Sequence, residues 1–218
     1  MNVKAVLFDM DGVIFDSERA VVDSWLVVSE SVGGIPGIES FCEKALGINS
    51  AATRELWFSI YGDKYPYDEL NQRRRDIFRE RFDAGLVAIK PGVIELLNYL
   101  KENGIKTAVA SSTSSASVIH EIKAAGLYDY FDEIVCGDMI EHSKPAPDIW
   151  LKAMDLLGVK PEDSAAIEDS FNGVKSAKAA GLYTFMVPDM VQPDDEIRGL
   201  ADIVLPSLNE VLDTLRGE

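Results

Sequence analysis

Short apolar runs recur along the chain, and most of the later ones are separated by amphipathic stretches with helical spacing. The runs cover residues 3–9, 106–111, 133–137, 164–169, 183–188 and, less clearly, 201–206. A short run that is apolar throughout is typical of a strand buried on both faces. We therefore predict strands at these six places.

The segments between the later strands carry helical patterns with helical end signals. Residues 93–101 are apolar at every third or fourth position and follow Pro91, a residue common at helix starts. The next three predicted helices cover residues 115–125, 147–157 and 171–180. Each is followed directly by a glycine, which commonly ends a helix. This alternation predicts an α/β fold with a Rossmann-like parallel sheet covered on both faces.

Residues 16–88 interrupt the alternation, because they contain no strand-like run. Apolar stripes with helical spacing cover residues 20–32 and 70–82, and two shorter helices are predicted at 38–46 and 51–60. We predict an inserted α-helical cap domain at 16–88 and a catalytic core formed by 1–15 and 89–218. An insert that leaves and re-enters the core at neighbouring points is placed to cover the end of the first strand like a lid.

Composition and charge exclude several classes of function. The chain has 218 residues, 47% of them hydrophobic, and a formal net charge of -16. A field of that sign repels nucleic-acid backbones and anionic membranes, so we expect neither as a partner. The start enters a strand by residue 3, no apolar run is as long as a membrane span, and Cys42 and Cys136 make no disulfide framework. We therefore expect a cytoplasmic protein. Because the net charge is negative, any small anionic substrate needs local positive charge at its binding site.

The first strand ends in two aspartates, Asp9 and Asp11, followed directly by Gly12. Side chains two residues apart in extended chain point to the same face, so these carboxylates would repel each other. The pair makes chemical sense if a cation holds one acid while the other carries a proton. The structural alternative is a solvated turn of the Asp-x-Asp-Gly kind at a strand end.

Further polar side chains follow the other predicted strands. They are the Ser111-Ser112-Thr113 run, Lys144 and the Glu168-Asp169 pair. Taken singly, the hydroxyls and the acids are explained as helix caps and Lys144 as a solvated loop residue. Because ligands bind beyond the carboxyl ends of parallel strands, their convergence favours a binding site for an anion and a cation.

These motifs resemble, in order and spacing, those of the haloacid dehalogenase superfamily, and within it the β-phosphoglucomutase-like phosphatase branch. The resemblance rests on residues 9–13, the run from Ser111, residues 143–148 and residues 168–177, and covers essentially the whole chain. It implies an Mg²⁺-dependent phosphatase acting on a small phosphorylated metabolite, with a sugar phosphate as the expected substrate. We expect a monomer.

The resemblance and the chemistry together suggest a role for each residue. Asp9 is the expected nucleophile, forming an aspartyl-phosphate, and Asp11 the general acid and then base. Mg²⁺ is expected on Asp9, the Asp11 carbonyl and Asp169, with Glu168 binding directly or through water. Ser111 and the Ser112 amide are expected to hold phosphate oxygens, and Lys144 to neutralise the developing charge.

Three alternatives remain open at this stage. The mutases of this branch carry a histidine about a dozen residues after the nucleophile, and in the cap an arginine shortly after a Gly-Val-Ser stretch, to which residues 47–50 are similar. Residues 17–22 contain no histidine and residues 47–50 no arginine, which weighs against a mutase. A non-enzymatic receiver-like phosphorylation switch needs neither a cap nor Asp11. A haloacid dehalogenase has no use for Asp11 or the Mg²⁺ acids.

Overall fold

The computed structural model describes residues 3–48 and 50–217, and the chain folds into two compact units. One unit, the core, consists of Met1–Phe15 and Ile89–Glu218, and the other, the cap unit, is Asp16–Ala88. Asn49, in the segment without a cap arginine, lies outside the described residues. The core therefore contains both ends of the chain and is interrupted once.

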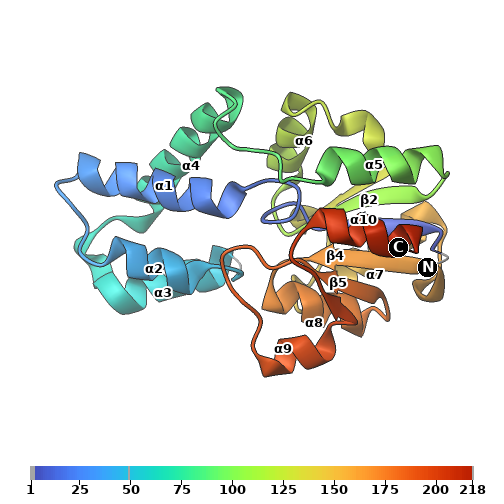
Figure 1. Cartoon of the computed structure of the whole chain (residues 1–218). Helices are drawn as coiled ribbons and strands as arrows, with labels where there is room; N and C mark the ends of the chain where they lie inside the picture. Colours follow the sequence, from blue (N-terminus) through green and yellow to red (C-terminus); the bar gives the residue numbers. More distant parts are fainter. Residues whose placement is uncertain (1–2, 49, 218) are drawn as a thin grey trace. The chain divides into compact units, whose positions relative to one another are not determined.

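A parallel sheet of six strands forms the centre of the core in the described part of the chain (Figure 1). The strands are β1 (Ala5–Phe8), β2 (Lys106–Ser111), β3 (Glu133–Cys136), β4 (Ser164–Glu168), β5 (Tyr183–Met186) and β6 (Ile203–Val204). Their order across the sheet is β3-β2-β1-β4-β5-β6, and every neighbouring pair is parallel. The first strand thus lies in the middle, between β2 and β4, where its carboxyl end is flanked by the ends of both.

Helices cover both faces of this sheet, as the complete burial of every residue in β1 requires. The core helices are α5 (Val93–Glu102), α6 (Ser115–Ala124), α7 (Asp148–Leu157), α8 (Phe171–Ala179), α9 (Asp195–Leu200) and α10 (Leu208–Arg216), and its 3₁₀ turns are η2 (Tyr128–Tyr130), η3 (Gly137–Met139) and η4 (Pro161–Asp163). α7 and α8 pack against one face around Trp150, Leu7 and Ala166. α5 and α10 pack on each other over the other face (Figure 1).

The cap unit is entirely helical in the part that the structure describes. Its helices are α1 (Ser17–Ser31), α2 (Ile38–Ala45), α3 (Ser50–Tyr61) and α4 (Tyr67–Asp83), with the 3₁₀ turn η1 (Gly62–Lys64). The cap unit has its own aromatic centre: Trp57 stacks on Trp25 at 5.1 Å between ring centroids and meets Phe41 edge-on at 5.0 Å. A separate apolar centre allows the insert to form a compact unit of its own.

The predicted α/β fold with an inserted helical domain is confirmed, and all six predicted strands are present. The two ends of the insert are adjacent, because Phe15 and Ile89 form an antiparallel β-bridge. Helices α9 and α10 were not predicted from the sequence. The signal for α10 was present in the apolar positions 208, 211, 212 and 215, all of which are buried along one helical face.

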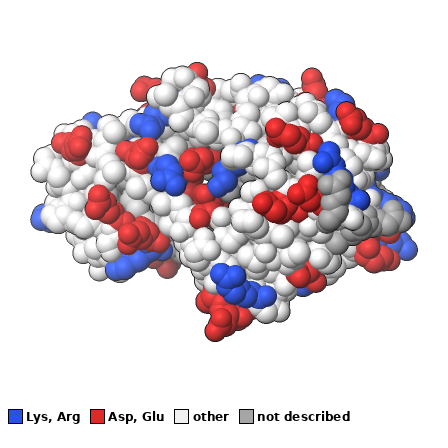
Figure 2. Space-filling model, viewed as in Figure 1, with Lys and Arg blue, Asp and Glu red and all other residues white. Residues whose placement is uncertain are grey.

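No helix among the described residues is long and apolar enough to cross a lipid bilayer. On the face of the molecule that Figure 2 shows, acidic side chains are spread over the surface of both units, and the basic ones stand in small separate groups. This distribution agrees with the net charge of -16.

Replacing Trp57 tests whether the aromatic centre stabilises the cap unit. Trp57→Ala removes a fully buried indole and the hydrogen bond from its Nε1 to the Tyr65 carbonyl. We expect the free energy of unfolding of the cap unit to fall by about 3–5 kcal/mol, the usual cost of such a cavity. Urea denaturation followed by tryptophan fluorescence measures it. The control is Ile60→Ala on the same helix, whose side chain is exposed; equal losses in both variants would contradict the expectation.

Candidate active site

The carboxyl end of β1 is followed by a tight loop that fixes both aspartates. The Ile14 amide donates to the Met10 carbonyl at 2.9 Å, and the Gly12 amide donates to the Phe15 carbonyl at 3.0 Å. Gly12 has a φ of +77°, a conformation that glycine adopts without steric cost. A Cβ atom at this position would also stand only 2.1 Å from Asp169 Oδ2. The absence of a side chain at Gly12 therefore lets Asp169, at the end of β4, approach the loop after β1.

Lys144 lies buried between two carboxylates from neighbouring strands. Its Nζ donates to Asp9 Oδ1 at 2.5 Å, to Glu168 Oε1 at 2.5 Å and to the Ala110 carbonyl at 3.1 Å. The ammonium also stands 4.7 Å from the centre of the Trp150 ring. All three N–H donors have acceptors, so a single lysine ties together the ends of β1, β2 and β4.

Burial and charge oppose each other in this triad. Burial raises the pKa of the Asp9 carboxyl above its ordinary value, and Lys144 acts in the opposite direction. Burial also opposes the charge on Lys144, but the adjacent Asp9 and Glu168 carboxylates outweigh it and raise the lysine pKa. When both carboxylates are ionised, the single ammonium leaves one buried negative charge uncompensated, so a bound cation would stabilise the ionised form of Asp9.

Glu168 is fully buried, and protein donors surround both of its oxygens. Oε1 accepts from Lys144, while Oε2 accepts from the Asp169 and Ser170 amides at 3.2 and 3.3 Å and from the Ser170 hydroxyl at 3.1 Å. Ser170 in turn caps α8 by accepting from the Gly173 amide. The positive end of the helix thus faces the carboxylate and stabilises its charge.

Hydroxyl groups at and just beyond the end of β2 bind the Asp11 carboxylate. Its Oδ2 accepts from Thr113 Oγ1 at 2.9 Å and lies 3.4 Å from Ser111 Oγ. The Ser111 hydroxyl accepts from the Thr113 amide, and Ser112 beside it is exposed. Thr113, which belongs to the polar run noted in the sequence but was given no role there, therefore orients Asp11.

All seven residues expected in the site lie at one edge of the sheet. These residues are Asp9, Asp11, Ser111, Ser112, Lys144, Glu168 and Asp169, at or just beyond the ends of β1, β2 and β4 or, for Lys144, in the loop after β3. Lys90 and Asp189, which form a largely buried ion pair, were not predicted as site residues from the sequence. A signal for Asp189 was available, because it follows the fifth predicted strand as the other acids follow theirs.

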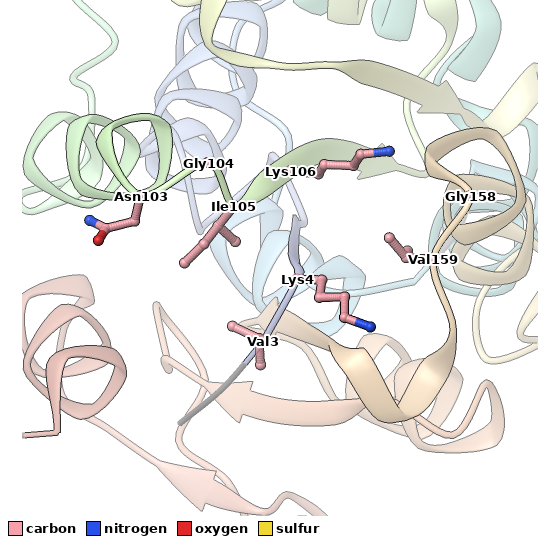
Figure 3. Close-up of a pocket in the computed structure, with 8 residues that line it drawn as sticks. All are labelled: Val3, Lys4, Asn103, Gly104, Ile105, Lys106, Gly158 and Val159. Atoms are coloured by element: carbon pink, nitrogen blue, oxygen red, sulfur yellow. The ribbon is translucent and has the colours of Figure 1, made fainter.

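A hollow of about 420 Å³ lies at the amino ends of β1 and β2, away from these residues (Figure 3). It is lined by Val3, Lys4, Asn103, Gly104, Ile105, Lys106, Gly158 and Val159. Its two lysines already have structural partners, because Lys4 pairs with Asp163 at 2.8 Å and Lys106 donates to the Leu157 carbonyl at 2.6 Å. None of the described residues that line this hollow is acidic, so the strand ends with their acids remain the candidate active site.

Replacing Gly173 tests how closely α8 encloses Glu168. A Cβ at Gly173 would stand 1.9–2.0 Å from the Glu168 carboxyl group. Gly173→Ala must displace this buried group, so we expect a loss of about 1–3 kcal/mol in the free energy of unfolding, as for other overpacked sites. Gly199→Ala, in α9 with open space around it, is the matched control and should be neutral or stabilising. Urea denaturation measures the free energy of unfolding of both variants. If Gly173→Ala were as stable as Gly199→Ala, α8 would not confine the Glu168 carboxyl group.

Comparison with known proteins agrees with this geometry. The family model of the haloacid dehalogenase-like hydrolases matches residues 3–181. The phosphorylated carbohydrates phosphatase of Thermotoga maritima is 32% identical over 180 residues, or 83% of this chain and 82% of that protein. The β-phosphoglucomutase of Bacillus subtilis is 31% identical over 218 residues, 95% of each.

A solved structure carries the same fold. The crystal structure of CbbY from Rhodobacter sphaeroides in complex with phosphate superposes with a TM-score of 0.80, at 30% identity and over 96% of both chains. The resemblance drawn from the four motifs is therefore confirmed. The chain belongs to the haloacid dehalogenase-like hydrolases and resembles the β-phosphoglucomutase-like members among them.

Proposed function

We propose that the protein is an Mg²⁺-dependent phosphatase that hydrolyses a small phosphorylated metabolite, in the first place a phosphorylated sugar, through an aspartyl-phosphate on Asp9. The observation that carries this proposal is the triad of Asp9, Lys144 and Glu168 together with Asp11, whose carboxylate Thr113 binds. It offers a nucleophile beside positive charge and a second carboxyl group that can donate and accept a proton. The sugar phosphate is suggested by the named activity of the Thermotoga relative.

In the first step, an Asp9 carboxylate oxygen attacks phosphorus and the bond from phosphorus to the ester oxygen breaks. Asp11, in its protonated form, donates the proton that the departing alcohol needs. The hydrogen bond from Thr113 Oγ1 to Asp11 Oδ2 fixes the orientation of this carboxyl group. The products of the step are the alcohol, phosphorylated Asp9 and ionised Asp11.

In the second step, water attacks the phosphorus of the aspartyl-phosphate. Asp11 accepts a proton from that water as the bond from phosphorus to the Asp9 oxygen breaks. Inorganic phosphate leaves, and Asp9 is again a carboxylate while Asp11 is again protonated. Ser111 and the Ser112 amide, at the end of β2, are proposed to hold the phosphate oxygens in both steps.

The residues around Gly12 fit a hard divalent cation. Asp9 and Asp169 have carboxylate oxygens, the ligands that Mg²⁺ prefers. When Asp9 and Glu168 are both ionised, the single ammonium of Lys144 does not balance their charge. We propose that Asp9, the Asp11 carbonyl and Asp169 hold Mg²⁺. When bound, the ion would neutralise phosphate oxygens and orient the ester.

Glu168 was expected to contribute to the metal site, directly or through water. Its hydrogen bonds favour another task, since both oxygens are engaged by Lys144, Ser170 and backbone amides. We propose that Glu168 holds Lys144 against Asp9. Lys144 then offsets the negative charge that gathers when a phosphate ester enters.

A sugar-phosphate mutase is the second candidate, and the identity to the β-phosphoglucomutase of Bacillus subtilis favours it. A mutase returns the phosphoryl group to a sugar hydroxyl in place of water. The absence of histidine from residues 17–22, where the mutases carry one, leads us to place hydrolysis first. Membership in a hydrolase family leaves the receiver-like switch without support.

Two aspartate variants separate the proposed roles. Asp9→Asn removes the nucleophile, so we expect no burst and no turnover with p-nitrophenyl phosphate. Asp11→Asn keeps the nucleophile but lacks the base for the second step. It should release about one nitrophenolate per enzyme and then turn over roughly 10²–10⁴-fold more slowly than the unmodified protein. Rapid-quench kinetics measures both, and Asp163→Asn, in a surface ion pair with Lys4, is the control. Normal turnover by Asp9→Asn would refute the mechanism.

Product analysis separates phosphatase from mutase. With β-glucose 1-phosphate and a catalytic amount of the 1,6-bisphosphate, we expect no bisphosphate-dependent formation of glucose 6-phosphate. A panel of sugar phosphates should instead release inorganic phosphate, because water is the proposed acceptor. The β-phosphoglucomutase of Bacillus subtilis serves as the positive control for isomerisation. Rapid isomerisation by this protein that depends on the bisphosphate would establish the mutase.

A further inference from the structure

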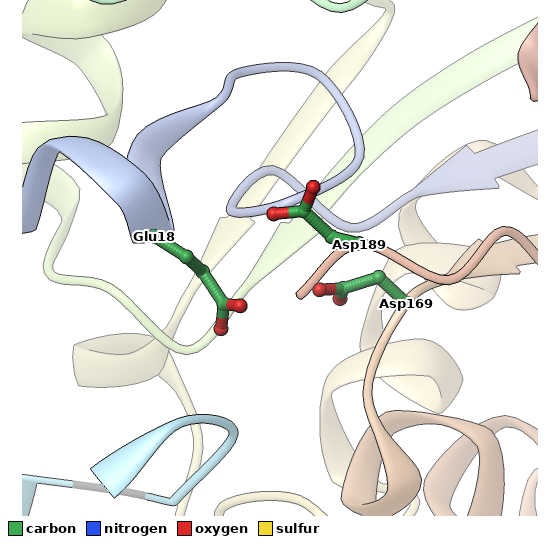
Figure 4. A group of neighbouring side chains, drawn as sticks. All are labelled: Glu18, Asp169 and Asp189. Atoms are coloured by element: carbon green, nitrogen blue, oxygen red, sulfur yellow. The ribbon is translucent and has the colours of Figure 1, made fainter. Parts of the chain in front are cut away.

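Asp189 is a buried acid that neither the sequence motifs nor the proposed catalytic steps use. It lies just beyond β5, which pairs with β4. The Val187 amide donates to the Glu168 carbonyl at 2.7 Å, so the pairing continues one residue past the end of β5. This extension places Asp189 at the same sheet edge as Asp169, the residue after Glu168 (Figure 4).

The two oxygens of Asp189 have different surroundings. Oδ1 accepts a hydrogen bond from Lys90 Nζ. Oδ2 is buried and has no hydrogen-bond partner among the described residues. Because the side chain is only 7% exposed, bulk water does not replace that partner. A buried carboxylate oxygen without a donor costs free energy, and such groups in native structures usually interact with an ordered water or ion.

Asp169 increases this cost, because a carboxylate oxygen of Asp189 lies within 4.8 Å of one of Asp169. Figure 4 shows the side chains of Asp169 and Asp189 directed into the same space. Glu18, also drawn there, is part of the cap unit. Like charges this close repel unless a cation or its bound water lies between them. A purely structural role for Asp189, as the partner of Lys90, would explain the hydrogen bond to Oδ1. It would not explain why Oδ2 is buried without a donor or why the two carboxylates lie so close together.

We propose that Asp189 is a further acid of the magnesium site, a positioning residue whose Oδ2 accepts a hydrogen bond from a water bound to the ion. Mg²⁺ usually takes one or two carboxylates directly and keeps several waters. Asp9 and Asp169 fill the direct positions in the proposed function, on which this inference rests, so the remaining acid binds through water. Partners of this kind orient the groups around a metal and increase its affinity.

Lys90 fixes the orientation of Asp189. Its backbone amide donates to the Ile14 carbonyl at 2.9 Å, in the bridge where the chain returns to the core. The lysine is thus anchored by its main chain, and the hydrogen bond from Nζ leaves Oδ2 as the oxygen available to the metal site.

Calorimetric titration of Mg²⁺ into the phosphate-free protein tests the proposal without measuring activity. Asp189→Asn keeps the shape of the side chain and removes its charge. We expect the Kd for Mg²⁺ to rise roughly 10- to 100-fold, as for other groups that act through a metal-bound water. Asp202→Asn is the matched control, because it also breaks an Asp–Lys ion pair of the core, with Lys178, and should leave the Kd unchanged.

The outcomes distinguish this inference from the proposed function. If the unmodified protein binds Mg²⁺ and Asp189→Asn binds it with the same Kd, Asp189 has no part in the site and the inference is overturned alone. If the unmodified protein binds no Mg²⁺, the proposed metal site fails and the inference with it. Asp189→Ser, smaller and also neutral, is titrated in place of the asparagine variant if that variant does not fold, and is judged by the same Kd.

Discussion

The ion triad of Asp9, Lys144 and Glu168 is the interaction on which the rest of the site depends. Each member is buried, and burial of an isolated charge is far more costly than burial of a charge with full hydrogen bonding. Removing any one of them would leave the others uncompensated. Because the three come from different segments, the triad also fixes the ends of β1 and β4 relative to the loop after β3.

The close packing around the acids depends on glycines, which have no side chain, as much as on charged residues. Gly12 leaves room for Asp169, and Gly173 leaves room for Glu168. In both places a single methyl group would stand within 2.1 Å of the carboxyl group and force it to move. At both glycines the backbone comes close to a carboxyl group and keeps it near the other acids of the site. The acids therefore lie closer together than their mutual repulsion would favour, and a bound cation would relieve that repulsion.

Two features separate the two acids that the proposed chemistry uses. Asp9 is buried beside Lys144, while Asp11, two residues on, is only partly buried and bound by Thr113. Acids in such different surroundings are suited to different tasks, one as a nucleophile and one as a proton carrier. The tight loop stabilised by Gly12 makes this difference possible within three residues of chain.

The sequence by itself determined the parallel sheet, the helical insert and the edge at which the polar residues gather. Strand and helix periods are local properties, and the carboxyl ends of parallel strands meet at one edge whatever their order. Only the tertiary structure decided which groups touch: that Lys144 lies between Asp9 and Glu168, and that Asp189 faces Asp169. Those contacts depend on the strand order and on loops that cross between strands, and residue spacing along the chain does not encode either.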